Sequence, residues 1–178
     1  HGGSLSPRDH AGSWLALVIV VRPPRPGVSR WGRPVTLAVA VVDAQTPGNV
    51  GTIARAMKNF GLSELYLVDP PELARDGEAY GFAGQAREDI LPNAQTVSFD
   101  ALVEGFHTVG TTAIPNEDDR RHVRYPFKTP RELAASLHRL DSAPCLVFAL
   151  ARPGLTHAVL SRLFLVCSIP TACASPVL

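Results

Sequence analysis

The sequence predicts an α/β protein with a mostly parallel central sheet flanked by helices. From residue 37 onward, short apolar segments alternate with segments of helical periodicity, which is typical of this class. The connections between them are short, as in compact α/β units. The first apolar segment, Leu37 to Val42, is continuous, which indicates a strand covered on both faces and therefore central and parallel.

The expected elements follow one another along the chain. The strands are expected at 37–43, 64–68, 95–98, 107–112, 144–150 and 165–169. The helices are expected at 50–60, about 79–90, 100–105, 129–139 and 156–163. Residues 37–178 therefore form one domain, and the apolar fraction of 46% is ample for its core.

The first helix carries the most informative polar residues. Its apolar side chains recur at the spacing of one helical face and are expected to dock on the sheet: Val50, Ile53, Ala54, Met57 and Phe60. The polar side chains fall elsewhere around the helix: Asn49, Arg55, Lys58 and Asn59. Pro47-Gly48-Asn49 is expected to form the turn into the helix, with Asn49 as N-cap and Gly61 as the left-handed residue after its end.

Two interpretations of Asn49 and Arg55 stay open at this point. Asn49 is explained as a helix cap and Arg55 as a solvated charge. Alternatively, both belong to a site, because this helix follows a central strand whose carboxyl end is where ligands bind in such sheets.

Net charge and cysteine content narrow the function classes. With 17 basic and 16 acidic side chains, any nucleic-acid site must be a local patch. Cys145, Cys167 and Cys173 lack the paired spacing of a zinc site, so free or buried thiols in a reducing cytoplasm are expected, with no metal. The fingerprints of dinucleotide oxidoreductases, P-loop NTPases, serine hydrolases and zinc proteases do not occur in the sequence.

Residues 1–36 are expected to be a disordered or non-native extension. They are rich in Arg and Pro and lack periodicity, apart from the apolar run Trp14 to Val21. That run is far shorter than the roughly 20 residues that span a bilayer, and it is expected to be a stray strand or part of the extension, with a signal peptide as the less favoured alternative. Met57 is the single methionine, which indicates an incomplete reading frame.

The longest non-periodic segment is 115–128. It combines basic side chains with Tyr125 and Phe127, groups that suit phosphate contact and base stacking; the basic ones are Arg120, Arg121, His122, Arg124 and Lys128. Glu117, Asp118 and Asp119, which directly precede Arg120, support the alternative of a solvated charged loop.

The motif at 47–61, PGNVGTIARAMKNFG, then Leu65-Tyr66-Leu67-Val68, Gly110-Thr111-Thr112-Ala113, Gly154-Leu155-Thr156 and Ile169-Pro170 occur in a characteristic order. In this combination the chain resembles the SPOUT superfamily of trefoil-knotted RNA methyltransferases, in the branch that 2′-O-methylates ribose at position 32 of the tRNA anticodon loop. Archaeal members, especially haloarchaeal ones, look most similar. The resemblance covers about 37–178.

The resemblance implies a homodimer that binds tRNA and S-adenosylmethionine at the knot. It places Asn49 and Arg55 beside the reacting ribose. The residues expected to contact the RNA are Arg55 and Lys58 of the first helix and Arg120, Arg121 and Arg124 of the basic loop. Residues implied to line the cofactor pocket are Thr111, Thr112, Ala113, Ala149, Gly154, Ile169, Pro176, Val177 and Leu178. Arginine suits stabilisation of a phosphate or developing alkoxide better than proton abstraction, because its pKa exceeds roughly 12.

The second family motif, Phe-Gly-x-Glu-x-x-Gly-Leu, is altered here. Ala149 replaces its Gly and Ala151 its Glu. The chain also stops at Leu178, before the family's knot-threading helix. We therefore expect the family function to be encoded, with little or no activity in this chain; the alternatives are a catalytically impaired RNA-binding remnant of the same fold and a Rossmann-like small-molecule domain.

Overall fold

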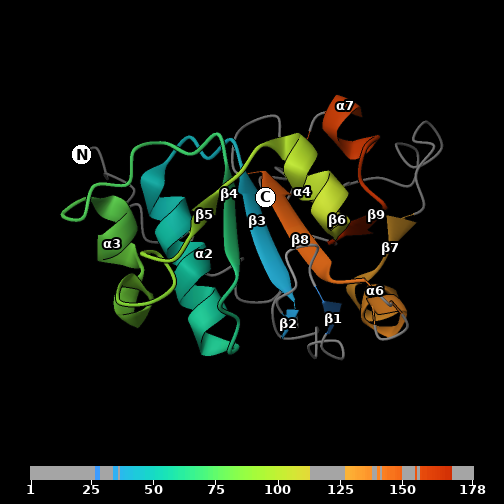
Figure 1. The fold of residues 1–178 in the computed structure, drawn as a ribbon, viewed down its shortest axis with the longest axis horizontal. Helices are drawn as coiled ribbons and strands as arrows, with labels where there is room; N and C mark the ends of the chain where they lie inside the picture. The colour runs from blue at the N-terminus through green and yellow to red at the C-terminus, as the bar shows by residue number, and fades with distance from the viewer. Residues whose placement is uncertain are drawn as a thin grey trace, which may run out of the picture.

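The computed structural model describes residues 27–28, 34–35, 37–112, 127–137, 140, 142–149, 155 and 157–169. Its main feature is a seven-stranded sheet in the order β5-β4-β3-β8-β6-β9-β7, and every neighbouring pair in it is parallel (Figure 1). The strands are β3 (Ala38–Val42), β4 (Leu65–Val68), β5 (Gln95–Thr96), β6 (His107–Thr112), β7 (Phe127–Lys128), β8 (Pro144–Ala149) and β9 (Leu165–Ser168). The expected α/β class with a parallel sheet is confirmed.

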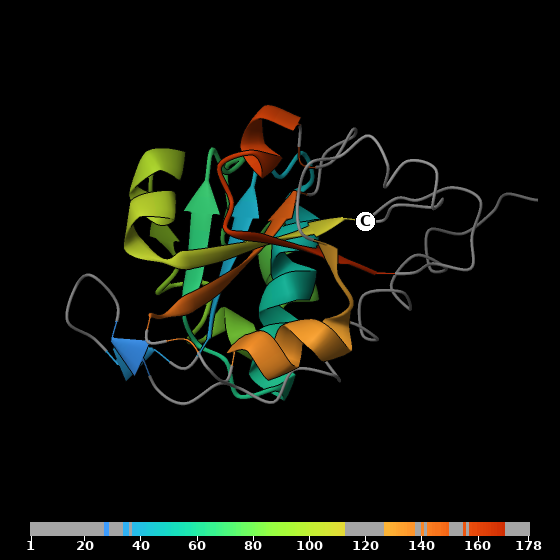
Figure 2. The same ribbon diagram turned by 90° about the vertical axis from the view of Figure 1, so that its right-hand side faces the viewer.

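Helices cover both faces of the sheet. They are α2 (Pro47–Asn59), α3 (Glu78–Phe82), the 3₁₀ helix η2 (Gly84–Arg87), α4 (Phe99–Gly105), α6 (Pro130–Leu137) and α7 (His157–Leu160). Helices α2, α3, η2 and α6 bury their apolar side chains in the core on one face, and α4 and α7 pack on the other (Figure 2). Among the described residues, no helix is long and apolar enough to cross a membrane.

Strand β3 lies at the centre, as its continuous apolar sequence predicts. Val39 and Val41 belong to the core under α2, while Ala38, Ala40 and Val42 belong to the core under α4. The chain runs outward from β3 to β4 and β5 and later returns to place β8 on the other side of β3. This change of direction makes the carboxyl edge beside β3 and β8 the place where such sheets bind ligands.

Helix α2 begins earlier than the sequence suggested. Its N-cap is Thr46 and Pro47 occupies the first helical position, where a missing backbone N–H costs nothing. The expectation that Asn49 caps the helix is therefore wrong, because Asn49 lies inside the first turn and donates its backbone N–H to the Thr46 carbonyl at 3.1 Å.

The expected end of α2 is confirmed. Gly61 has φ +69°, and the backbone N–H groups of Gly61 and Leu62 donate to the carbonyls of Lys58 (3.2 Å) and Met57 (2.9 Å). This is the Schellman arrangement, in which a left-handed glycine lets the chain leave the helix.

The helix expected at about 79–90 is shorter. It ends at Phe82, and a 3₁₀ helix follows from Gly84. Gly84 has φ +57°, which an α-helix cannot accommodate. The other expected elements are found within a few residues of their predicted bounds.

Three two-residue strands are absent from the sequence-based expectation. Phe127–Lys128 forms β7, which pairs with β9, at the end of the segment expected as a loop. Gly27–Val28 (β1) and Pro34–Val35 (β2) form a separate antiparallel pair within the expected extension. Strands this short have no periodicity to detect. The apolar run Trp14 to Val21 lies outside the described residues.

Candidate active site

Three adjacent strands end together at the carboxyl edge of the sheet, and we call this group of residues the strand-end site. Strand β6 pairs Thr112 with Ser168 of β9 and Gly110 with Val147 of β8, so Thr112 is level with Ala149. The strand-end site comprises Thr111, Thr112, Ala149, Ser168 and Ile169. Four of the expected cofactor residues are thus brought together; Ala113, Gly154, Pro176, Val177 and Leu178 lie outside the described residues.

The two hydroxyl groups described in this site differ in their partners. Thr111 Oγ1 donates to the Val147 carbonyl at 3.2 Å and so ties β6 to β8. Ser168 is only 4% exposed, and its Oγ forms no hydrogen bond with any described residue. A buried hydroxyl without a partner is unfavourable, which distinguishes Ser168 from Thr111 among the described residues of this site.

Ala149 occupies its position without backbone strain. It is the last residue of β8, is half-buried, and is not among the described residues with positive φ. The loss of glycine therefore does not force a disfavoured backbone here, and its effect is confined to the added methyl group. Ala151 lies outside the described residues.

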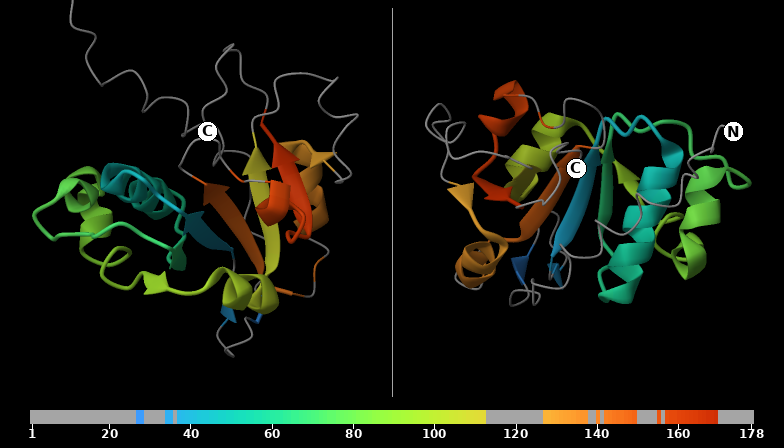
Figure 3. Two further views of the ribbon diagram at one scale, coloured as in Figure 1. Left: turned by 90° about the horizontal axis from the view of Figure 1, so that it is seen from above. Right: turned by 180° about the vertical axis from the view of Figure 1, so that it is seen from behind.

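A second group lies where α2 packs against α3 and η2, and we call this contact the seam. A Cβ placed on Gly51 would lie 2.0 Å from the Ala79 carbonyl oxygen, so the two helices approach backbone to backbone. A Cβ on Gly48 would lie 2.6 Å from the Phe82 ring. Figure 3 shows α2 and α3 side by side at one end of the molecule, away from α7 and β9.

Arg55 extends along this seam. Its Cδ and Nε lie 3.7 Å from the Cβ position of Gly84, whose lack of a side chain leaves room for the arginine stem. Arg55 is exposed, and in the described part of the chain no carboxylate pairs with it. Asn49 is half-buried on the first turn of the same helix. Both residues therefore stand on the helix that starts at the carboxyl edge.

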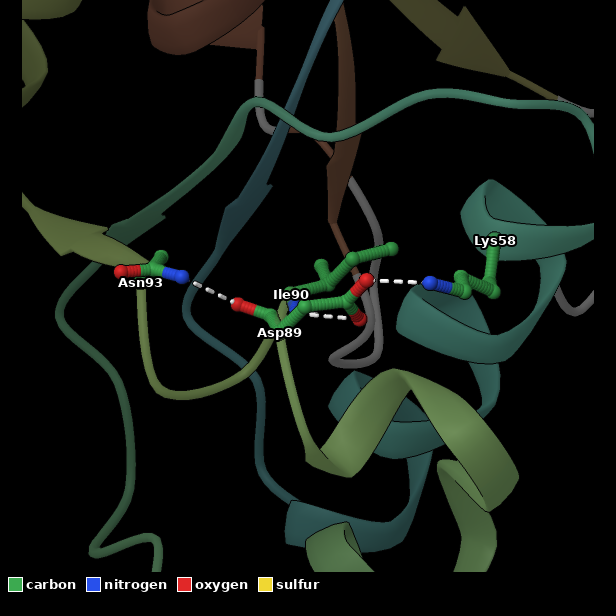
Figure 4. A network of polar contacts seen from close by, with 4 residues as sticks. All are labelled: Lys58, Asp89, Ile90 and Asn93. Atoms are coloured by element: carbon green, nitrogen blue, oxygen red, sulfur yellow. Dashed lines mark hydrogen bonds and ion pairs between the residues drawn. The ribbon is translucent and has the colours of Figure 1, made fainter.

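Lys58 is placed differently from Arg55. It lies in the last turn of α2, where its ammonium forms an ion pair with Asp89 (Figure 4). Figure 4 also shows Asp89 accepting from the Ile90 backbone N–H, and the Asn93 side chain donating to the Asp89 carbonyl. The hydrogen bond from Lys58 is the main cause that lowers the pKa of Asp89. Arg120, Arg121 and Arg124 lie outside the described residues.

Sequence reasoning missed three residues near this edge: Asp43, Asp69 and Ser168. Asp43 and Asp69 directly follow β3 and β4 and both have φ +49°, a left-handed conformation that aspartate tolerates better than most residues. Gln45 Nε2 donates to Asp43 Oδ1 at 3.0 Å. An aspartate after a buried strand was the available signal for the first two; Ser168 gave none, because its burial depends on the fold.

The described thiols are unsuited to nucleophilic chemistry. Cys145 and Cys167 are free and buried, as expected from the sequence. Burial raises the pKa of Cys167 to about 11 and raises the pKa of Cys145 as well. Both are therefore protonated near neutral pH. Cys173 lies outside the described residues.

The fold and these two groups define a parallel α/β protein in which the carboxyl edge of the sheet lies beside a helix carrying Arg55, an arginine that pairs with no carboxylate in the described part of the chain. Residues 36–178 match the model of the SpoU rRNA Methylase family, and the chain belongs to this family. It is 34% identical over 145 residues to the tRNA (cytidine-2′-O-)-methyltransferase TrmJ of Methanocaldococcus jannaschii, covering 81% of this chain and 62% of that protein. It is 38% identical over 129 residues to the tRNA (cytidine/uridine/adenosine-2′-O-)-methyltransferase TrmJ of Pseudomonas aeruginosa, covering 71% and 48%.

Solved structures agree with this assignment. A probable methylase family protein from Haemophilus influenzae superposes with a TM-score of 0.70 at 31% identity, over 80% of this chain and 58% of that one. TrmJ from Z. mobilis gives a TM-score of 0.65 at 28% identity, over 79% and 61%. The chain therefore spans about half to three fifths of the length of these relatives.

Proposed function

We propose that this chain is the methyl-transfer domain of an S-adenosylmethionine-dependent tRNA 2′-O-ribose methyltransferase. Family membership supports methyl transfer, and the relatives' names supply tRNA as the substrate. The observation that supports the assignment to particular residues is Arg55, an exposed guanidinium on the helix that begins at the carboxyl edge, with no carboxylate partner among the described residues.

The strand-end site fits a bound cofactor. Backbone groups at the ends of β6, β8 and β9 converge there, and Ser168 Oγ is a buried hydroxyl to which no described residue forms a hydrogen bond. Thr111, Thr112, Ala149 and Ile169 would hold S-adenosylmethionine together with Ser168. When bound, the cofactor supplies an activated methyl group on a sulfonium.

The protein's contribution is positioning and charge stabilisation. Transfer to a ribose hydroxyl is an in-line displacement, so the acceptor oxygen must be held in line with the methyl group. Arg55 would hold the adjoining phosphate and favour the developing alkoxide through its fork of N–H donors. Asn49, about one and two-thirds turns earlier on the same helix, would orient the ribose.

The tRNA position that is methylated and the oligomeric state are inferred from the same family resemblance. We propose that the methylated ribose lies in the tRNA anticodon loop at position 32, that the protein acts as a homodimer, and that it works in the cytoplasm. The buried free thiols Cys145 and Cys167 are compatible with a reducing compartment.

A catalytically impaired RNA-binding remnant is the second candidate. The sequence observation that favours it is Ala151, which stands where the family motif has a glutamate. Arg55 does not distinguish the two candidates, since a remnant would keep this RNA-facing arginine and lose only methyl transfer.

The test combines methyl transfer with cofactor binding. Incubation of the chain with a tRNA transcript and methyl-labelled S-adenosylmethionine should transfer label into RNA, and the modified ribose should block alkaline cleavage at its 3′ phosphate. Calorimetry should show cofactor binding to the chain alone. Salt-dependent tRNA binding without transfer would establish the remnant. Absence of both cofactor binding and tRNA binding would contradict the proposed function.

A further inference from the structure

Phe82 is an exposed aromatic residue that contacts no other aromatic ring among the described residues. It is 54% exposed, and Phe164 is the other large hydrophobic side chain that is exposed in the described part of the chain. Phe164 stacks on His107, with ring centroids 4.5 Å apart. The Phe82 ring instead rests on backbone, because a Cβ on Gly48 would lie 2.6 Å from its Cδ2 and Cε2 atoms.

The ring is therefore held on one side and open on the other. Gly48 is buried in the first turn of α2, and Phe82 is the last residue of α3, so both anchor points belong to regular structure. An aromatic ring with a fixed position and a free surface is the kind of platform on which a nucleobase stacks.

Phe82 lies on the same seam as Arg55. Gly48 and Arg55 are seven residues apart on one face of α2, which corresponds to roughly 10 Å along the helix at 1.5 Å per residue. The aliphatic part of the Arg55 side chain packs against Gly84, which is two residues after Phe82. Phe82 therefore lies at the amino end of α2, nearer the carboxyl edge of the sheet, and Arg55 lies farther along the same face of the helix.

The two ends of the seam carry opposite charges, Glu78 beside Phe82 and Arg55 beside Gly84, and these charges favour different parts of a nucleotide. Glu78 Oε2 lies 3.3 Å from the same Gly48 Cβ position, so a carboxylate borders the ring and disfavours a phosphate there. At the other end, Arg55 attracts phosphate. A neutral base on Phe82 and its backbone on Arg55 satisfy both ends.

We propose that Phe82 is a base-stacking residue that receives an unpaired nucleobase of the substrate RNA loop and thereby sets its ribose relative to Arg55. This inference rests on the proposed function, since it concerns the RNA of the same site. It assigns Phe82 a binding role that the sequence motif at 47–61 does not contain.

The test is a binding cycle between a protein variant and a modified RNA. The RNA probes are a tRNA anticodon stem-loop hairpin and a series in which each loop nucleotide in turn is abasic. The proteins are wild type, Phe82→Leu, which keeps apolar cover over Gly48 but lacks a π face, and Phe82→Tyr, which keeps the ring. Thermal unfolding of each variant confirms that it folds.

Phe82→Leu should weaken binding of the intact hairpin by about fivefold or more, the usual effect of losing one stacked base. It should have no effect on the hairpin that is abasic at the stacked position, and Phe82→Tyr should bind as wild type. Equal binding of wild type and Phe82→Leu to every hairpin would overturn the proposal, as would a changed oligomeric state with unchanged RNA affinity. Methyl transfer by wild type with that result would leave the proposed function standing, whereas loss of transfer and of all RNA binding would remove both.

Discussion

The seam and the strand-end site are built in opposite ways. The seam joins α2 to α3 and η2, which lie within 47–87; Gly51 meets the Ala79 backbone there, and Gly48 meets the Phe82 ring. The strand-end site joins β6, β8 and β9, which lie at 107–168, and it contains a buried hydroxyl without a partner. The comparison teaches that one half of the candidate site is closed by packing, while the other is left with an unmet hydrogen bond.

The largest expected effect breaks the seam. Gly51→Ala would put a methyl group 2.0 Å from the Ala79 carbonyl oxygen, a backbone atom that cannot move without separating α2 from α3. Overpacking of this kind costs about 1–3 kcal/mol or more of the free energy of unfolding. Chemical denaturation should show this loss of stability. A separate binding measurement should show weaker RNA binding.

Gly81→Ala is the matched control. Gly81 is exposed in α3, and a Cβ there would meet nothing within 4 Å. Alanine should leave stability unchanged or raise it by roughly 0.5–1 kcal/mol, because helical glycine is unfavourable. Equal stabilities for Gly51→Ala and Gly81→Ala would show that the seam is not close-packed.

The two regions also differ in how far the sequence predicts them. The apolar face of α2, its glycine end and the strands were predictable, because each depends on local periodicity. The cap at Thr46, the break at Gly84 and the exposure of Phe82 depend on how α3 packs on α2. Ser168 could not be selected from sequence, since its burial and lack of a partner arise only when β9 joins β6.

A smaller effect is expected from Ser168→Ala, which tests the unmet hydrogen bond. If Ser168 Oγ donates to the cofactor, the variant should bind S-adenosylmethionine more weakly by about 0.5–1.5 kcal/mol, measured by calorimetry. Without cofactor the same variant should be at least as stable as wild type, because a buried unpartnered hydroxyl has been removed.

Thr108→Val provides the comparison for that prediction. Thr108 Oγ1 is also buried and forms no hydrogen bond with a described residue, but Thr108 lies near the amino end of β6, away from the strand-end site. Its replacement should preserve or raise stability and leave cofactor affinity unchanged. A loss of affinity in both variants, or in neither, would mean that Ser168 has no special relation to the cofactor.

The smallest expected effect is a pH dependence at the amino end of β6. Burial lowers the pKa of His107 below its ordinary value of 6.5, and its Nε2 has no hydrogen-bond partner in the part of the chain that the structure describes. The unfolded chain therefore binds a proton more readily than the folded one, so this contribution to stability is complete above about pH 6.5 and is lost as the pH falls through the folded-state pKa.

Replacement of His107 by Phe, which can still stack on Phe164, should flatten the stability profile between pH 7 and pH 5. Denaturation at several pH values checks this. An unchanged slope in the variant would assign the pH dependence to other groups, and a change in cofactor affinity would contradict the separation between the two ends of β6.

The central claim is that Arg55 serves the RNA and the strand-end site serves the cofactor. It is tested most directly by measuring RNA affinity, methyl transfer and cofactor affinity side by side for Arg55→Ala, with exposed Arg131 of α6 replaced by Ala as control. We predict weaker RNA binding, transfer reduced about 100-fold or more, and unchanged cofactor affinity, with Arg131→Ala behaving as wild type. Unchanged RNA binding and transfer in Arg55→Ala would contradict the account.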